Sequence, residues 1–248
     1  MPAMSEPPQL DRQCPATTRL DRFVQSYPHA PYVLPFVAFL VLMGIGGRFG
    51  PEYLHYAYAV RIFGSLAVAL VFWRYFPPLG KVHWIPSIVV GLAVAYGWVE
   101  GHHWFRSQSW YFQPFPDAKP DAFYDPRAYV GQGVGLRLFL VVRILGAATV
   151  VPIVEEIFWR AFILRLLIDR YDFESVPLGK FTWMSFILCS LMSALEHPQW
   201  GVGILCWMVY NLLFYWKKSL MCLMVTHGIT NLALYVYVFI NEDWVFWS

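Results

Sequence analysis

Charged side chains are scarce in this chain of 248 residues. Asp, Glu, Lys and Arg make up 14% of it, whereas an ordinary soluble domain carries about 25%. Hydrophobic residues account for 58% and aromatic residues for 19%, a balance typical of a polytopic membrane protein. The net charge of +2 provides no broad basic surface. We therefore expect contact with the lipid bilayer and none with nucleic acid.

Cysteine is scarce too, and its spacing excludes two further classes of protein. The four cysteines show no CxxC or zinc-knuckle spacing, which argues against a disulfide framework and a cysteine-based metal centre. Several catalytic signatures are also missing, namely GxSxG, HExxH, a glycine-rich phosphate loop and a charged pore-lining repeat. A serine hydrolase of the usual type, a zincin and a nucleotide hydrolase are thereby disfavoured.

Long apolar runs dominate what remains. They approach or exceed the roughly 20 residues that cross a bilayer, and runs of this length are helices. The predicted fold is all-α, a polytopic transmembrane helical bundle. We expect a polar cytoplasmic tail at 1–30, one integral membrane domain at 31–240 and a short C-terminal tail at 241–248. The runs lie at about 32–47, 54–76, 83–100, 134–168, 181–197, 200–216 and 219–240.

The run at 134–168 decides the number of crossings, because it contains Pro152. As one long helix it gives seven membrane helices and a cytoplasmic N-terminus, and the basic loops then share one side, as the positive-inside rule prefers. As two helices it gives eight, and Arg137 and Arg143 would suit an interfacial first half. We prefer seven and keep eight as the alternative. The loop residues concerned are Arg74, Lys81, Arg170, Lys180, Lys217 and Lys218.

Three charges interrupt the apolar stretch Val150–Leu164 within this run. Glu156 and Arg160 are four residues apart, so on a helix they can pair, whereas Glu155 faces about 100° away. A charged side chain at the centre of a membrane helix costs about 2.5–3.5 kcal/mol. Because Glu155 has no partner in its own helix, a functional role is the default hypothesis for it.

Two later helices carry polar side chains at comparable depth. His197 ends the fifth run, while His227 and Asn231 share one face of the last. At 1.5 Å per residue, Glu155, His197 and His227 lie roughly 20, 24 and 12 Å from the same membrane side. Given the uncertainty of helix boundaries, these depths are compatible with one intramembrane cluster.

A carboxylate, two imidazoles and an amide form a set suited to activating water. Glu155 would act as general base and His197 would hold the water, while His227 and Asn231 would stabilise an oxyanion. This reaction needs no cofactor. A zinc-dependent version would use Glu155, His197 and His227 as ligands. The third reading is non-catalytic, a membrane scaffold or immunity-type protein whose polar network locks the helices together.

The ordered set Glu155-Glu156-x-x-x-Arg160, His197 and His227-x-x-x-Asn231 resembles the CPBP (Abi) family, which includes the type II CAAX prenyl endopeptidases. The resemblance covers about 134–240. Within the family, the bacterial CAAX prenyl protease-related branch, found beside exosortase genes, is the most similar.

The resemblance implies a glutamate-type intramembrane endopeptidase acting on a membrane-associated protein or peptide in the bacterial inner membrane. It implies that Glu155 and His197 activate water, that His227 and Asn231 form the oxyanion site, and that Glu156 and Arg160 support them. The family commonly has eight helices. Two departures occur here: Ser193 stands where the family commonly has Phe, and Ala161 where it has Gly.

Overall fold

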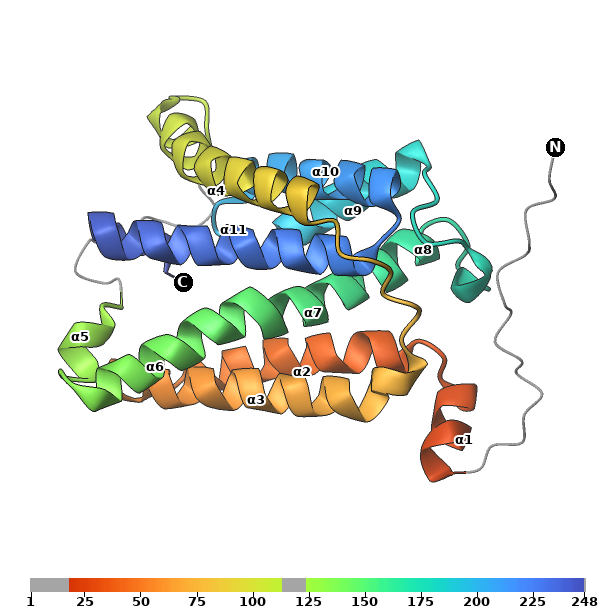
Figure 1. Ribbon diagram of the computed structural model, residues 1–248, viewed down its shortest axis with the longest axis horizontal. Coiled ribbons are helices and arrows are strands. Elements are labelled where there is room, and N and C mark those ends of the chain that lie inside the picture. The colour runs from red at the N-terminus through yellow and green to blue at the C-terminus, as the bar shows by residue number, and fades with distance from the viewer. Residues whose placement is uncertain (1–17, 113–123, 248) are drawn as a thin grey trace.

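A computed structural model describes residues 18–112 and 124–247 of the chain (Figure 1). All regular secondary structure in these residues is helical. No strand occurs in these ranges, so the predicted all-α fold is confirmed. Each of the seven apolar runs contains at least one helix. The α-helices are α1 (Arg19–Ser26), α2 (Ala30–Gly46), α3 (Leu54–Phe72), α4 (Trp84–Ser107), α5 (Pro126–Tyr129), α6 (Val134–Leu145), α7 (Val151–Glu156), α8 (Leu164–Leu166), α9 (Trp183–Ala194), α10 (Trp200–Lys217) and α11 (Leu220–Asn241).

The run that contains Pro152 is one continuous helical segment of 33 residues, Val134–Leu166, as predicted. It consists of α6, α7 and α8 joined by two π-helical segments, Gly146–Val150 and Ile157–Ile163. Pro152 lies in the first turn of α7, directly after the first π-helical segment. The wider π turn accommodates a residue that has no backbone N–H, so the segment continues through the proline.

Fewer helices meet the length and apolarity of a membrane span than the seven or eight that the sequence predicts. Four helical segments in the described residues are long and apolar enough to span, at Pro51–Tyr75, Trp84–Ser107, Val134–Leu166 and Leu220–Asn241. A fifth span results if α1 and α2, bent by 93° to each other, are counted as one. Because α9 has only 12 residues, it falls short of a span. Seven or eight membrane helices are therefore not confirmed.

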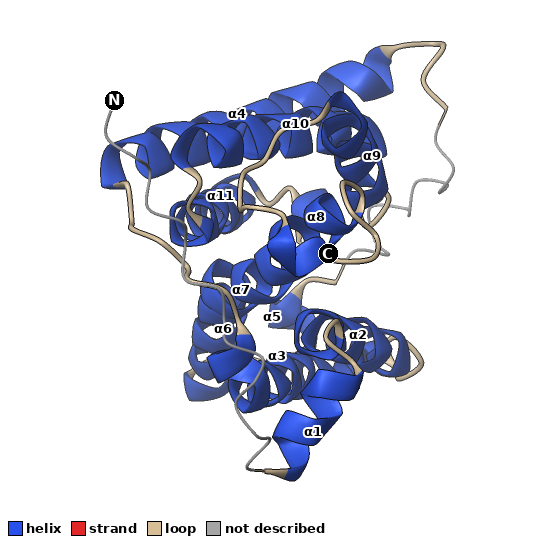
Figure 2. Cartoon of the chain, turned by 90° about the vertical axis from the view of Figure 1, so that its right-hand side faces the viewer, coloured by secondary structure: helices blue, strands red, loops and turns tan. Residues whose placement is uncertain are grey.

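The helices form two groups with the long segment between them (Figure 1). On one side α2 packs along α3, and on the other α4 packs along α11 and α9 along α10. The end-on view shows the same division, with α4, α9, α10 and α11 above and α2 and α3 below (Figure 2). Since α11 packs against both α7 and the preceding π-helical segment, it joins the two groups.

A close approach sets the position of α11 on the long segment. A Cβ atom on Gly228 would lie 2.2 Å from the carbonyl oxygen of Ala148, so only glycine fits there. One turn later, Asn231 Nδ2 donates to the carbonyl oxygen of Ala147 at 2.8 Å. Both carbonyls lie about one helical turn before Pro152, where a backbone N–H at position 152 would be expected to donate. Pro152 has no N–H, so it can bond to neither of them. The polar backbone beside Pro152 is thus covered by α11.

Replacing Gly228 by Ala should therefore destabilise the protein by about 1–3 kcal/mol, the usual cost of overpacking. The added methyl group would push α11 away from the Ala148 carbonyl. Thermal unfolding of the purified protein in detergent measures the change. Gly97→Ala in α4 is the matched control, because no atom lies within 4 Å of its Cβ position, and we expect it to stabilise the helix by about 0.5–1 kcal/mol. Equal effects of the two substitutions would contradict this account.

Candidate active site

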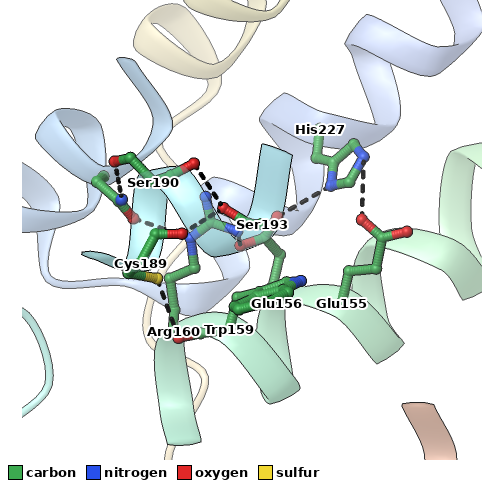
Figure 3. A network of polar contacts seen from close by, with 9 residues as sticks. Glu155, Glu156, Trp159, Arg160, Cys189, Ser190, Ser193 and His227 are labelled. Atoms are coloured by element: carbon green, nitrogen blue, oxygen red, sulfur yellow. Dashed lines mark hydrogen bonds and ion pairs between the residues drawn. The ribbon is translucent and has the colours of Figure 1, made fainter. Parts of the chain in front are cut away.

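Glu155, Glu156 and Arg160 are all buried inside the helical bundle (Figure 3). Glu156 and Arg160 are 0% exposed and Glu155 is 4% exposed. Arg160 Nη1 lies 2.9 Å from Glu156 Oε2. The i,i+4 pair expected from the sequence therefore exists, and it is fully withdrawn from solvent. Two opposite charges buried together avoid most of the penalty that either would incur alone.

Glu156 also reaches the last helix. Its second oxygen, Oε1, lies 2.9 Å from His227 Nδ1, and the other ring nitrogen, His227 Nε2, lies 4.0 Å from Glu155 Oε2. Glu156 is thus a bridge between Arg160 and His227, a connection that the sequence did not reveal. Because a carboxylate paired with a guanidinium is ionised and can only accept, the hydrogen of this contact belongs to His227 Nδ1.

Glu155 lies close to the turn that follows α9, which carries Glu196 and His197. One ligand atom each from Glu155, Glu196 and His197 all lie within 4.8 Å of one another. In the described residues, Glu155 Oε2 is buried and has no hydrogen-bond partner. The His197 ring packs between Trp98, with ring centres 5.2 Å apart, and Trp207, at 6.1 Å. A carboxylate oxygen without a hydrogen-bond partner therefore lies near an imidazole that packs against two tryptophans.

The predicted site residues do not all meet at one point. Glu155 lies near both His197 and His227, on α7, on the turn after α9 and on α11 respectively. Asn231 instead contacts the backbone of the long segment through the bond to Ala147. Its Nδ2 has a second hydrogen, which this contact does not use. Ser193, the departure from the family pattern, is buried and donates to the Cys189 carbonyl.

Glu196 is the main residue that sequence reasoning left without a role. It precedes His197 directly, and its carboxylate belongs to the cluster with Glu155. The available signal was a second glutamate inside a stretch already selected for its histidine. Two carboxylates and an imidazole are also a plausible donor set for a divalent metal. The set differs from the predicted zinc ligands, because Glu196 takes the place of His227.

The separations suit a bridging water as well as a metal. Atoms bridged by one water are about 4.5–5.5 Å apart, and ligands of a tetrahedral zinc are about 3.3 Å apart. Separations within 4.8 Å are compatible with either arrangement. The cluster can therefore hold a water or a divalent metal.

Residues 137–233 match the family model described as type II CAAX prenyl endopeptidase Rce1-like. The matched stretch includes all six residues that carry the sequence resemblance, so that resemblance is confirmed. No curated protein and no solved structure matches the chain.

Substituting Glu156 by Gln should destabilise the protein strongly, by about 3–5 kcal/mol, since it leaves Arg160 as an unpaired buried charge. Chemical unfolding in detergent, followed by tryptophan fluorescence, measures this. The control is Arg127→Ala, which breaks exposed ion pairs to Asp125 and Glu242 and should cost about 0–1 kcal/mol. A Glu156→Gln variant as stable as the control would show that the buried pair does not support the fold.

Proposed function

Because residues 137–233 carry the Rce1-like match, we propose that this protein is an intramembrane endopeptidase that hydrolyses a peptide bond of a membrane-associated protein or peptide. The observation that carries the proposal is the buried Glu155 carboxylate, which has an unpartnered oxygen and shares a cluster with His197 and Glu196. A general base needs a water within reach and a means of holding it. In this cluster Glu155 would be the base, and His197 and Glu196 would hold the water.

In the proposed reaction, a water bound between Glu155 and His197 gives a proton to Glu155 as its oxygen attacks the carbonyl carbon of the substrate. The carbonyl π electrons move to the oxygen and form an oxyanion. When the intermediate collapses, the C–N bond breaks and Glu155 returns the proton to the leaving nitrogen. The products are a carboxylic acid and an amine, and no oxidant or reductant is consumed.

The oxyanion would be stabilised by His227 and Asn231. Asn231 has one N–H left for this purpose beyond its bond to Ala147. His227 already directs its Nδ1 hydrogen to Glu156, so it can donate to an oxyanion only from Nε2. That requires the doubly protonated ring, whose positive charge would add to the stabilisation.

The proposal includes a cellular setting. We propose a multi-pass protein with a cytoplasmic N-terminus, on the distribution of basic loop residues, and the bacterial inner membrane as its location, as the sequence resemblance implies. The substrate class follows from the family name alone, so a prenylated C-terminal peptide is the first probe to use.

Replacing Glu155 by Gln should abolish cleavage, with a loss of at least about 10²–10⁴-fold in turnover, because Gln cannot accept the proton. The assay uses purified protein in liposomes, with a farnesylated Cys-aliphatic-aliphatic-X peptide and its unlipidated form, and mass spectrometry of the products. Glu52→Gln, at an exposed position, should leave turnover unchanged. Retained turnover in Glu155→Gln would disprove the proposal. If that variant also kept its cellular function while Arg160→Ala unfolded, the scaffold or immunity reading would hold.

A zinc-dependent version of the same peptidase is the second candidate, and the cluster of Glu155, Glu196 and His197 is the observation that favours it. The two versions differ in one measurement. For the water-based reaction, treatment with 1,10-phenanthroline should leave peptide cleavage unchanged, and elemental analysis should find less than one metal per chain. Loss of cleavage on chelation, with recovery on adding zinc, would establish the metal version.

A further inference from the structure

A second layer of buried polar side chains lies behind Arg160, on the side away from Glu156. Arg160 Nε donates to Asn211 Oδ1 at 3.2 Å, and Asn211 Nδ2 donates to Ser190 Oγ at 2.9 Å. The Ser190 hydroxyl donates in turn to the Phe186 carbonyl at 2.7 Å. Asn211 and Ser190 are both 0% exposed. Neither has a part in the proposed reaction, although burying them requires a reason.

These hydrogen bonds have only one consistent direction. The hydroxyl hydrogen of Ser190 is committed to Phe186, so its oxygen must accept from the Asn211 amide nitrogen. The amide oxygen then faces Arg160. If the amide turned over, its NH₂ group would face the guanidinium N–H, and two donors would meet without an acceptor. Ser190 therefore fixes the orientation of Asn211, and Asn211 fixes one edge of Arg160.

Trp207, on the same face of α10 as Asn211, stacks on the plane of the Arg160 guanidinium. Trp207 lies one turn before Asn211, and the central carbon of Arg160 lies 4.4 Å from the centre of a Trp207 ring. With one edge bonded and one face stacked, the guanidinium has little freedom. Of its two remaining nitrogens, Nη1 lies 2.9 Å from Glu156 Oε2.

The chain of contacts ends at the imidazole beside Glu155. Arg160 keeps Glu156 ionised and oriented, and Glu156 Oε1 then accepts from His227 Nδ1. We propose that Ser190 and Asn211 are positioning residues, which through Arg160 and Glu156 keep a hydrogen on His227 Nδ1 and leave Nε2 beside Glu155, in position to donate to the oxyanion. Their effect on turnover rests on the proposed function, whereas their effect on the His227 ring does not.

A purely structural role would have a different signature. If Ser190 and Asn211 served only to pack α9 against α10, their loss would lower stability and leave the His227 ring unchanged. As positioning residues, they control which ring nitrogen carries the hydrogen when the ring is neutral. Nitrogen-15 chemical shifts distinguish the two neutral forms of histidine. This readout needs no substrate.

The test uses full-length protein labelled with ¹⁵N-histidine in detergent micelles, at a pH where the ring is neutral. A His227→Gln sample identifies the His227 signals among the seven histidines. We expect the Nδ1–H form in the unchanged protein and a mixture of both forms in Ser190→Ala. Ser190→Thr keeps the hydroxyl and should restore the Nδ1–H form. In the peptide assay, Ser190→Ala should lower kcat by about ten- to a hundredfold with little change in KM, and Ser190→Thr should recover it.

The matched control is Ser65→Ala. Ser65 is also 0% exposed and donates to the carbonyl four residues earlier, at 2.7 Å, but it lies on α3. It should change neither the ring signal nor kcat. If Ser190→Ala fails to fold, Asn211→Asp replaces it, since Asp keeps the shape but draws Arg160 away from Glu156.

An unchanged Nδ1–H signal in a folded Ser190→Ala or Asn211→Asp variant would overturn the inference, as would an equal change in Ser65→Ala. If instead the signal changes as expected while Glu155→Gln still cleaves the peptide, the positioning role stands and the proposed peptidase reaction fails.

Discussion

The buried ion pair between Glu156 and Arg160 is the interaction on which the centre of this protein depends. Both side chains are fully withdrawn from solvent, where an unpaired charge would cost several kcal/mol. Each partner therefore fixes the other, and each then contacts a different helix: Glu156 reaches α11 through His227, and Arg160 reaches α10 through Asn211 and Trp207. One pair within a single helix thereby sets the relative position of three.

This arrangement requires a defined position of α11 along the long segment Val134–Leu166. Contacts of α11 with the backbone of that segment fix this position. Gly228 allows contact with the Ala148 carbonyl, and Asn231 bonds to the Ala147 carbonyl. Both are on the helix that carries His227. Pro152, which has no N–H to donate to either carbonyl, lies three residues before Glu155. The contacts that satisfy the backbone thus also bring the imidazole to the carboxylates.

Side-chain contacts within one helix were predictable from the sequence, whereas most contacts between helices were not. The pairing of Glu156 with Arg160 follows from four-residue spacing, and the positions of the helices follow from the apolar runs. The contacts of Glu156 with His227 and of Arg160 with Asn211 join residues 71 and 51 positions apart. No spacing rule connects such residues. Glu196 received no role because a lone glutamate beside a histidine gives no periodic signal. The number of crossings is not confirmed, because apolar composition does not fix helix length, as the 12-residue α9 shows.

The π-helical segment before α7 determines which changes of length the chain can tolerate during evolution. A π turn holds about one residue more than an α turn, and one residue corresponds to a rotation of about 100°. Deleting a single residue from Gly146–Val150 would let the helix relax to ordinary winding while both flanking segments keep their register. Relatives that retain the charges should therefore tolerate the loss of one residue at 146–150, whereas a deletion in α7 before Glu155 would turn this side chain away from His197 by about 100°.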